Sequence, residues 1–331
     1  MIRATPGLRE PLRRLLTSIG VHRSGGQEDI AILSCRRAGS TWLMQMLAAT
    51  PGIRSVNEPD LPELIAQRGL PTGLEGVLKP HFRKVLDVPT GSEELFRSYL
   101  FDPRITRIRG PYNPFSPSFH LLTDRRVLKM VHATAIAEWI ANQGLRPVYL
   151  VRHPIASALS MTRSATTLRV EANLRHEGFR ARFLGDDQVE LAWSVMESGS
   201  PLERFVLEWC LDNLGPLRAS RKHPDRWTVL SYEELVLSAT RLVPVLGRRL
   251  DLHDPDRMLR VVRTPSASTR GGSHAKLRQK DPLQLVGLWE RDVDHETQAR
   301  LFEIVERFEI DVYRPDTIMP TERYLNLEHP S

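Results

Sequence analysis

Short apolar runs alternate along most of the chain with segments of helical periodicity. The runs have the length and polar flanks of buried strands, and they predict strands at residues 30–35, 53–56, 127–131, 147–151 and 227–231. Apolar residues at helical spacing predict helices near residues 41–49, 134–143, 155–162, 201–220, 233–247 and 295–308. This alternation predicts a three-layer α/β fold, with helices covering both faces of a central parallel sheet.

Some segments depart from this alternation. Residues 101–125 are rich in proline, arginine and aromatic residues, and residues 163–200 are charged and weakly periodic. Residues 264–282 form a third irregular segment, which is polar and basic. Loops of such length in a compact domain are usually functional or disordered. We therefore expect a single domain over residues 30–318 that carries the first two segments as excursions, followed by a tail over residues 319–331.

Residues 1–29 are expected to be an extension that precedes this domain. Leucines at helical spacing lie beside arginines over residues 7–19, which predicts a basic amphipathic helix. Such a helix can dock on the protein's own body, on a membrane surface or on a partner. The sequence leaves these alternatives open.

Composition narrows the kinds of site that are expected. The chain has 331 residues, of which 41% are hydrophobic and 26% charged, as in ordinary globular proteins. Two cysteines are too few for a disulfide framework, and no cluster has the spacing of metal ligands. No run of 18 apolar residues or secretory signal is apparent. We expect a cytoplasmic protein with no integral membrane segment and no bound metal.

The charge of the chain favours an anionic ligand. Its formal net charge is +6, and arginine is spread throughout. Nucleic acid is one such ligand, but no zinc finger, RNP-like motif or basic-aromatic ladder is present. A phosphorylated or sulfated small molecule explains the charge equally well.

The sequence SCRRAGSTWL at residues 34–43 lies between a predicted strand and a predicted helix. Backbone N–H groups in such a turn, the helix N-terminus and the hydroxyls of Ser40 and Thr41 would converge on an anion. The Walker A pattern is absent, which weighs against an ordinary nucleotide triphosphatase. The structural alternative is a turn glycine at Gly39, a helix cap at Ser40 or Thr41, and a core tryptophan at Trp42.

A second candidate anion site is VYLVRHPIASALSM at residues 148–161. Arg152 ends an apolar strand, and Pro154 suits the first turn of a helix. Ser157 and Ser160 are three residues apart and so share a helical face. The alternative is a surface arginine followed by two helix serines.

Together with LSYEEL at residues 230–235, these motifs resemble the sulfotransferases that use 3′-phosphoadenosine 5′-phosphosulfate, over roughly residues 30–315. In that family the first turn holds the 5′-phosphate side of the donor, the arginine and serine hold its 3′-phosphate, and the tyrosine lies by the adenine. The resemblance therefore implies donor-binding roles for Arg37, Ala38, Gly39, Ser40, Thr41, Trp42, Arg152, Ser160 and Tyr232.

Within the family, residues 37–59 are most similar to the carbohydrate 6-O-sulfotransferases and, less closely, to the tyrosylprotein enzymes. Both place a glutamate shortly after the second strand as the proposed base, and Glu58 matches it. Lys129 matches a strand-end lysine near the transferred group. His132 is the rival base, although it is one residue further along than the histidine of the cytosolic enzymes. Arg37 replaces a lysine often found in the first turn.

Two further assignments concern neighbouring loops. The family's C-terminal phosphate-binding element is missing, and Arg270, Gly271 and Gly272 either replace it or belong to an ordinary flexible loop. Asp60 and Glu63 are spaced like a helix cap and its reciprocal partner, which leaves Glu58 outside that structural role.

The resemblance implies transfer of a sulfuryl group to the hydroxyl of a carbohydrate or another small alcohol or phenol, with adenosine 3′,5′-bisphosphate as product and no metal. Arg37, Lys129, Ser40 and Thr41 would stabilise the leaving group. Residues 101–125 and 163–200 would border the acceptor. The alternatives are a P-loop kinase-like or nucleotide-binding protein and a non-catalytic nucleic-acid-binding protein.

Overall fold

A computed structural model describes residues 21–60, 97, 100–101, 119–164, 166–264, 266 and 281–321. The helix expected over residues 7–19 and most of the segment 101–125 therefore lie outside the described residues. Arg270, Gly271, Gly272 and Glu63 also lie outside them.

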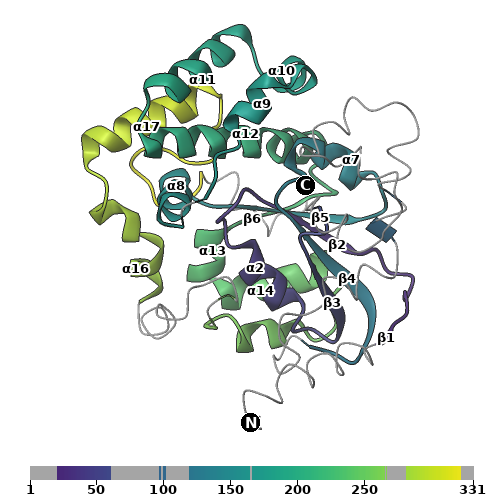
Figure 1. Cartoon of the computed structure of the whole chain (residues 1–331). Helices are drawn as coiled ribbons and strands as arrows, with labels where there is room; N and C mark the ends of the chain where they lie inside the picture. Colours follow the sequence, from purple (N-terminus) through teal and green to yellow (C-terminus); the bar gives the residue numbers. More distant parts are fainter. Residues whose placement is uncertain are drawn as a thin grey trace, which may run out of the picture.

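All strand pairings in the described sheet are parallel (Figure 1). β2 (Ile30–Leu33) lies between β4 (Leu122–Met130) and β5 (Arg146–Val151). β4 also pairs with β3 (Gly52–Asn57) and with the short β1 (Val21–His22), and β6 (Thr228–Ser231) pairs with β5. The five predicted strands are confirmed, whereas β1 is too short to produce a pattern in the sequence.

Alternate residues of the strands belong to different cores. Ala31 and Leu33 lie in the core on one face of the sheet, while Ile30 and Ile32 lie in the core on the other. All four side chains are fully buried. A strand covered on both faces needs apolar residues at every position, which explains the continuous apolar runs of the sequence.

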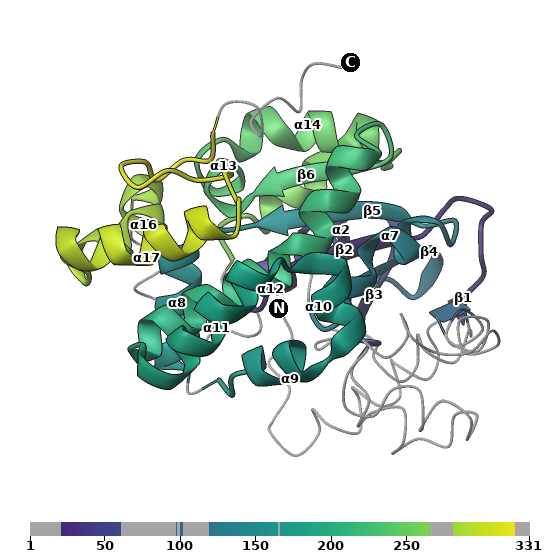
Figure 2. The ribbon, with the colours of Figure 1, turned by 90° about the horizontal axis from the view of Figure 1, so that it is seen from above.

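Helices cover both faces, and Figure 2 shows α12 and α14 on opposite sides of the strands. The first core is covered by η2 (Thr134–Ile136), α7 (Ala137–Ala141), α8 (Pro154–Arg163), α12 (Pro201–Lys222) and α17 (His295–Arg307). The second is covered by α2 (Ser40–Leu47), α13 (Tyr232–Leu237), α14 (Ala239–Arg249) and η3 (Pro255–Arg260). The predicted three-layer α/β architecture is confirmed.

The expectation of an irregular segment at residues 163–200 is wrong. This segment forms α9 (Val170–Arg175), α10 (Glu177–Phe183) and α11 (Asp186–Ser198). Each contributes apolar side chains, among them Leu174, Phe179 and Ala192, to the core that contains α12. Two of these helices are too short for a periodic pattern to emerge over a window of 11–18 residues.

The remaining helices lie near the end of the described chain. α16 (Pro282–Val286) and η5 (Leu288–Arg291) precede α17. The single helix predicted over 233–247 is two helices, because α13 ends at Leu237 and α14 begins at Ala239. In the described part of the chain, no helix is long and apolar enough to cross a membrane.

Gly215 allows α12 to pack closely against η2. A Cβ atom at this position would lie 2.2 Å from the carbonyl oxygen of Thr134. Gly215→Ala should therefore lower the free energy of unfolding by about 1–3 kcal/mol, the usual cost of overpacking a core. Urea unfolding monitored by circular dichroism measures this change.

Gly185→Ala is the matched control, because a Cβ atom at Gly185 would meet nothing within 4 Å. Its cost should stay below about 1 kcal/mol, since only the helix N-cap changes. Equal unfolding midpoints for the two variants would contradict the close packing of α12 on η2.

Candidate functional site

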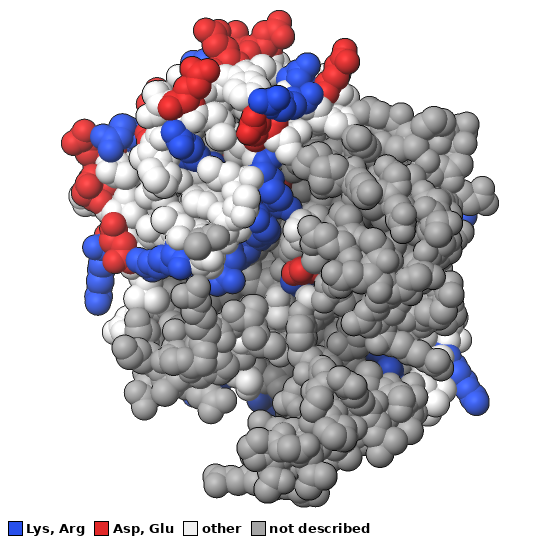
Figure 3. Space-filling model, viewed as in Figure 1, with Lys and Arg blue, Asp and Glu red and all other residues white. Residues whose placement is uncertain are grey.

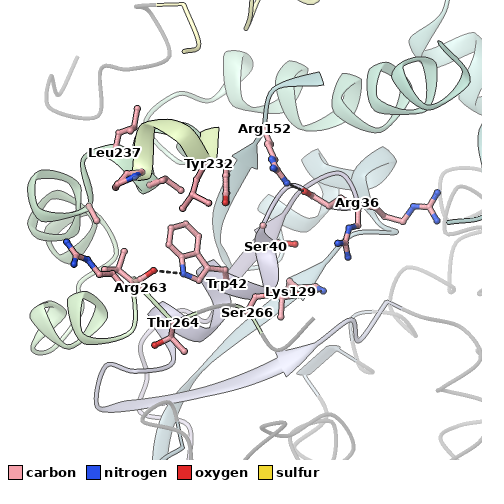
Figure 4. A pocket seen from close by; sticks show the side chains of 18 of the residues that line it. Arg36, Ser40, Trp42, Lys129, Arg152, Tyr232, Leu237, Arg263, Thr264 and Ser266 are labelled. Carbon is pink, nitrogen blue, oxygen red and sulfur yellow. Dashed lines mark hydrogen bonds between the residues drawn. The ribbon is translucent and has the colours of Figure 1, made fainter. Parts of the chain in front are cut away.

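A cavity of about 1040 Å³ lies where the carboxyl ends of the strands meet. Figure 4 shows side chains from several elements pointing into it. One wall is mostly polar and is formed by residues at the ends of the strands or after them: Arg36, Arg37, Gly39, Ser40, Thr41, Trp42, Glu58, Lys129, His132, Arg152 and Tyr232. A second wall, beside Trp42 and Tyr232, is largely apolar and includes Val236, Leu237, Leu259, Val262 and Leu285.

The turn between β2 and α2 presents its backbone to the cavity. Arg37 and Gly39 have φ angles of 66° and 97°, and α2 begins at Ser40. The first N–H groups of a helix have no partner within the helix and carry its positive end. A Cβ atom at position 39 would lie 2.7 Å from Cδ2 of Tyr232. Glycine is therefore required both by the backbone conformation and by the close approach of this ring.

Arg152 lies directly against this turn. Its Nη1 donates a hydrogen bond of 3.0 Å to the carbonyl oxygen of Arg37, and its guanidinium lies 4.4 Å from the ring centroid of Tyr232. Its Nε is buried and has no hydrogen-bond partner among the described residues. Figure 4 shows Arg152 and Tyr232 beside Ser40 and Trp42. A cation, a helix N-terminus and an aromatic ring therefore meet in one cavity.

Trp42 completes an aromatic corner with Tyr232. The two rings are 5.7 Å apart in an edge-on arrangement. The indole N–H of Trp42 donates a 3.0 Å hydrogen bond to the carbonyl oxygen of Val262, which fixes the ring against the apolar wall. Such a corner suits a flat aromatic group carried by an anionic ligand.

Ser160 does not line the cavity itself but contacts Arg37, which does. Nε of Arg37 donates a 3.0 Å hydrogen bond to Oγ of Ser160. Ser157 is fully buried, and Ala38 belongs to the apolar core, so neither side chain lines the cavity.

Lys129 links the start of α2, just after the turn that follows β2, to the residue that follows β3. Its Nζ lies 3.2 Å from Oγ1 of Thr41 and 2.5 Å from Oε1 of Glu58. The Lys129 side chain is 4% exposed, whereas that of Glu58 is 26% exposed and lines the cavity. Glu58 has a φ of 48°, a conformation that is uncommon for residues other than glycine. Strained backbone of this kind gathers at functional sites.

Asp60 lies behind this pair. Its Oδ2 accepts a 2.7 Å hydrogen bond from the backbone N–H of His132, and the residue is fully buried. Burial, with the nearby charge of Glu58, raises the pKa of the Asp60 carboxyl to about 7. The helix-cap role that pairs Asp60 with Glu63 stays a prediction, because Glu63 lies outside the described residues.

A buried ion network underlies the turn and was not identified from the sequence. Glu208 and Asp212 lie one helical turn apart on α12 with 0% and 2% of their side chains exposed. Glu208 pairs with Arg36 and Arg169, and Asp212 pairs with Arg169. The signal in the sequence is a pair of carboxylates four residues apart within residues 205–212, a stretch that is otherwise apolar.

The structure places most of the predicted site residues around one cavity, together with residues that the sequence did not indicate. Residues of the cavity that had not been identified include Thr166, Thr240, Arg263, Thr264 and Asp281. They belong to no motif and reach the cavity only through the packing of the segments after β5 and β6. Within the described ranges, no group of three or more His, Cys, Asp or Glu residues could hold a metal ion.

Surface charge is unevenly distributed around the helices. Figure 3 shows acidic side chains over the outer helices α11 and α17, and a band of basic side chains between them and the residues that are not described. The arginine and lysine residues that line the cavity are Arg36, Arg37, Lys129, Arg152 and Arg263. The positive charge of the chain is therefore partly concentrated at this site.

No family model matches the chain, and no curated protein matches it. Among solved structures, the chain is similar to the sulfotransferase domain from the curacin biosynthetic pathway, with 20% identity over 86% of this chain and 98% of that domain and a TM-score of 0.44. The sulfotransferase domain of the Synechococcus PCC 7002 olefin synthase has 19% identity, 88% and 98% coverage and a TM-score of 0.44. Mouse sulfotransferase SULT7A1, complexed with PAP, has 13% identity, 96% and 92% coverage and a TM-score of 0.41. At such values the function has to be argued from the cavity itself.

Asp60 should make the stability of the protein depend on pH. An unfolded aspartate titrates near pH 4, whereas the folded pKa is about 7. Between these values the folded state holds a proton that the unfolded state has released, so stability falls as the pH rises from about 4 to 7. Asp60→Asn should therefore be more stable than the wild type at pH 8, by on the order of 2–4 kcal/mol.

Urea unfolding at several pH values between 4 and 8 measures this difference, which should vanish near pH 4. Asp256→Asn, at an exposed position in η3, controls for the loss of a carboxylate as such. A difference between Asp60→Asn and the wild type that is constant across this range would contradict the prediction.

Proposed function

We propose that this chain is a sulfotransferase that uses 3′-phosphoadenosine 5′-phosphosulfate as donor and releases adenosine 3′,5′-bisphosphate. The observation that carries this proposal is the position of Arg152. Its guanidinium lies between the turn before α2 and the ring of Tyr232. This arrangement offers two anion sites and an aromatic surface in one cavity, which is what a nucleotide with separate 5′ and 3′ phosphates requires.

The residues present fit such a donor. The turn of Gly39, Ser40 and Thr41 would hold the 5′-phosphate side through backbone N–H groups and hydroxyls. Arg152 has a buried Nε without a partner among the described residues, and Ser160 is joined to the turn through Arg37. These groups would hold the 3′-phosphate.

The adenine would lie by the aromatic corner of Trp42 and Tyr232 and the apolar wall beside it. The cavity volume of about 1040 Å³ is at the upper end for small-molecule sites. It would therefore leave room for an acceptor next to the donor.

The proposed reaction is an in-line displacement at sulfur. The acceptor hydroxyl oxygen forms a bond to sulfur, the bond from sulfur to the oxygen of the 5′-phosphate breaks, and the hydroxyl proton passes to Glu58. Charge that develops on the leaving phosphate would be stabilised by Lys129 and Arg37, together with the hydroxyls of the turn. Lys129 contacts both Thr41 and Glu58, so the leaving group and the base would lie on either side of one ammonium.

We further propose that the acceptor is the hydroxyl of a carbohydrate or of another small alcohol or phenol. The support is the resemblance of the first turn and Glu58 to the carbohydrate 6-O-sulfotransferases. Glu58 is partly exposed at the cavity wall, where an acceptor can reach it.

Ligand binding tests the donor assignment. Adenosine 3′,5′-bisphosphate should raise the Tm without Mg²⁺, because a ligand that binds only the folded state stabilises it. Arg152→Ala should weaken bisphosphate binding by about one to two orders of magnitude, because it removes a charge-assisted hydrogen bond to the ligand. Binding of adenosine 5′-monophosphate should change far less. Isothermal titration calorimetry measures both affinities.

Arg163→Ala is the control, because Arg163 lies on α8 with its side chain 60% exposed and paired with Asp292. Arg152→Lys, which keeps the charge without the planar fork, should lose less affinity than Arg152→Ala. Equal stabilisation by the mono- and bisphosphate would overturn the donor assignment. Preference for ATP with Mg²⁺ would instead support a kinase-like protein.

Glu58→Gln tests the base. The amide keeps the size of the side chain but cannot take up a proton, so turnover should fall by roughly 10²–10⁴-fold. Affinity for the bisphosphate should remain close to that of the wild type. The assay transfers labelled sulfate from the donor to a panel of sugar, alcohol and phenol acceptors.

Glu303→Gln, on the exposed side of α17, is the matched control and should leave turnover unchanged. Near-normal turnover of Glu58→Gln on an acceptor that the wild type sulfates would show that Glu58 is not the general base.

A further inference from the structure

The hydrogen bond between His132 and Arg169 determines which ring nitrogen carries the hydrogen. Nη1 of Arg169 lies 2.7 Å from Nδ1 of His132. A guanidinium has only donors and remains charged in proteins, so Nδ1 must accept this bond. In a neutral imidazole whose Nδ1 accepts, the hydrogen is on Nε2. Rotating the ring by 180° would place a carbon atom against the guanidinium, and a carbon atom cannot accept its hydrogen bond.

Arg169 is itself fixed by buried carboxylates. Its Nη2 donates a 2.5 Å hydrogen bond to Oδ2 of Asp212, and its backbone N–H donates one of 2.7 Å to Oε2 of Glu208. Its Nε lies 3.5 Å from Oε1 of Glu208, and Nη1 also donates to the carbonyl oxygen of Val131. These contacts hold the guanidinium in one orientation, so its N–H points at His132.

His132 is also held through its main chain and lies in the proposed reaction site. Its backbone N–H donates to Asp60, as described above. His132 is one of the residues that line the cavity, together with Glu58 and Lys129. The residue is therefore positioned from both its ring and its backbone.

We propose that Arg169 fixes His132 as a hydrogen-bond donor, whose Nε2–H donates to an oxygen of the bound substrate. To act as a general base, His132 would need a free electron pair on Nε2 and hence a hydrogen on Nδ1. That hydrogen would face the N–H of Arg169 at 2.7 Å. Glu58 therefore accepts the proton, His132 donates, and Arg169 is a positioning residue that makes no contact with substrate.

The donation to substrate rests on the proposed function, whereas the position of the ring hydrogen does not. Long-range ¹H–¹⁵N correlation spectra of the imidazole nitrogens, recorded at pH 8, distinguish the two neutral forms. His132→Gln identifies the His132 signals by their loss. The wild type should show the hydrogen on Nε2, and a hydrogen on Nδ1 would overturn the proposal.

Arg169 variants test the cause of this preference. Arg169→Lys keeps a charged donor and should retain the hydrogen on Nε2. Arg169→Met removes the donor and should allow a population with the hydrogen on Nδ1. If folded Arg169→Met gives the same His132 spectrum as the wild type, Arg169 is not what places the hydrogen on Nε2. If this variant fails to fold, the wild-type spectrum still decides the tautomer, because a hydrogen on Nδ1 there would overturn the proposal.

Turnover of two His132 variants then separates a donor from a base. His132→Gln keeps an N–H donor near the position of Nε2 but has no basicity, so its turnover should stay within about tenfold of the wild type. His132→Ala removes the donor and should lose about tenfold to hundredfold. Equal losses of roughly 10²–10⁴-fold in both variants would instead identify His132 as the base. If the wild type transfers no sulfate to any acceptor, the proposed function fails, and the spectra still decide the tautomer.

Discussion

The site depends on the parallel register of the sheet. Leu33 pairs with both Met130 and Tyr149, and Asn57 pairs with Lys129, so β2, β3, β4 and β5 end at nearly the same level. Residues just beyond parallel strands therefore meet at one edge. A shift by one residue in any pairing would turn the side chains of that strand to the opposite face. β2, β3, β4 and β5 each place apolar side chains in both cores, so such a shift would force these side chains to repack on both faces of the sheet.

Some buried charged residues hold the sheet and the turn in place, whereas others line the cavity. Arg126 pairs with Asp29, and Arg125 donates to the backbone carbonyl oxygens of Glu28 and Leu250, so these arginines hold the sheet to its surroundings. Glu208 and Asp212 fix other arginines below the turn. A buried carboxylate without its cation is strongly destabilising, so this network ties the shape of the cavity to the packing of α12. Arg152, by contrast, presents its guanidinium to the cavity.

Two residues at the same edge have a strained backbone conformation. Among the described residues, the positive φ angles outside glycine include those of Arg37 and Glu58, and both residues line the cavity. Each follows a strand whose ladder is fixed: the N–H of Glu58 still donates to the carbonyl oxygen of Lys129 at 2.8 Å. Such conformations cost of order 1–3 kcal/mol each and persist only where the surroundings hold them. In this protein they orient one cation and one carboxylate toward the space where the proposed donor and acceptor would meet.

The sequence by itself determined five of the six described strands, most of the longer helices, the three-layer architecture and the polar turn after β2, because these depend on local periodicity and on short motifs. It did not determine the helices α9, α10 and α11, whose apolar residues acquire a pattern only when they pack on α12. The contacts that join Asp60, Arg169 and His132 also needed the tertiary structure. Asp60 and His132 are 72 positions apart, and Arg169 and His132 are 37 apart. Hydrogen bonds between such distant positions, and the burial that shifts a carboxyl pKa, are set by folding and leave no local pattern in the chain.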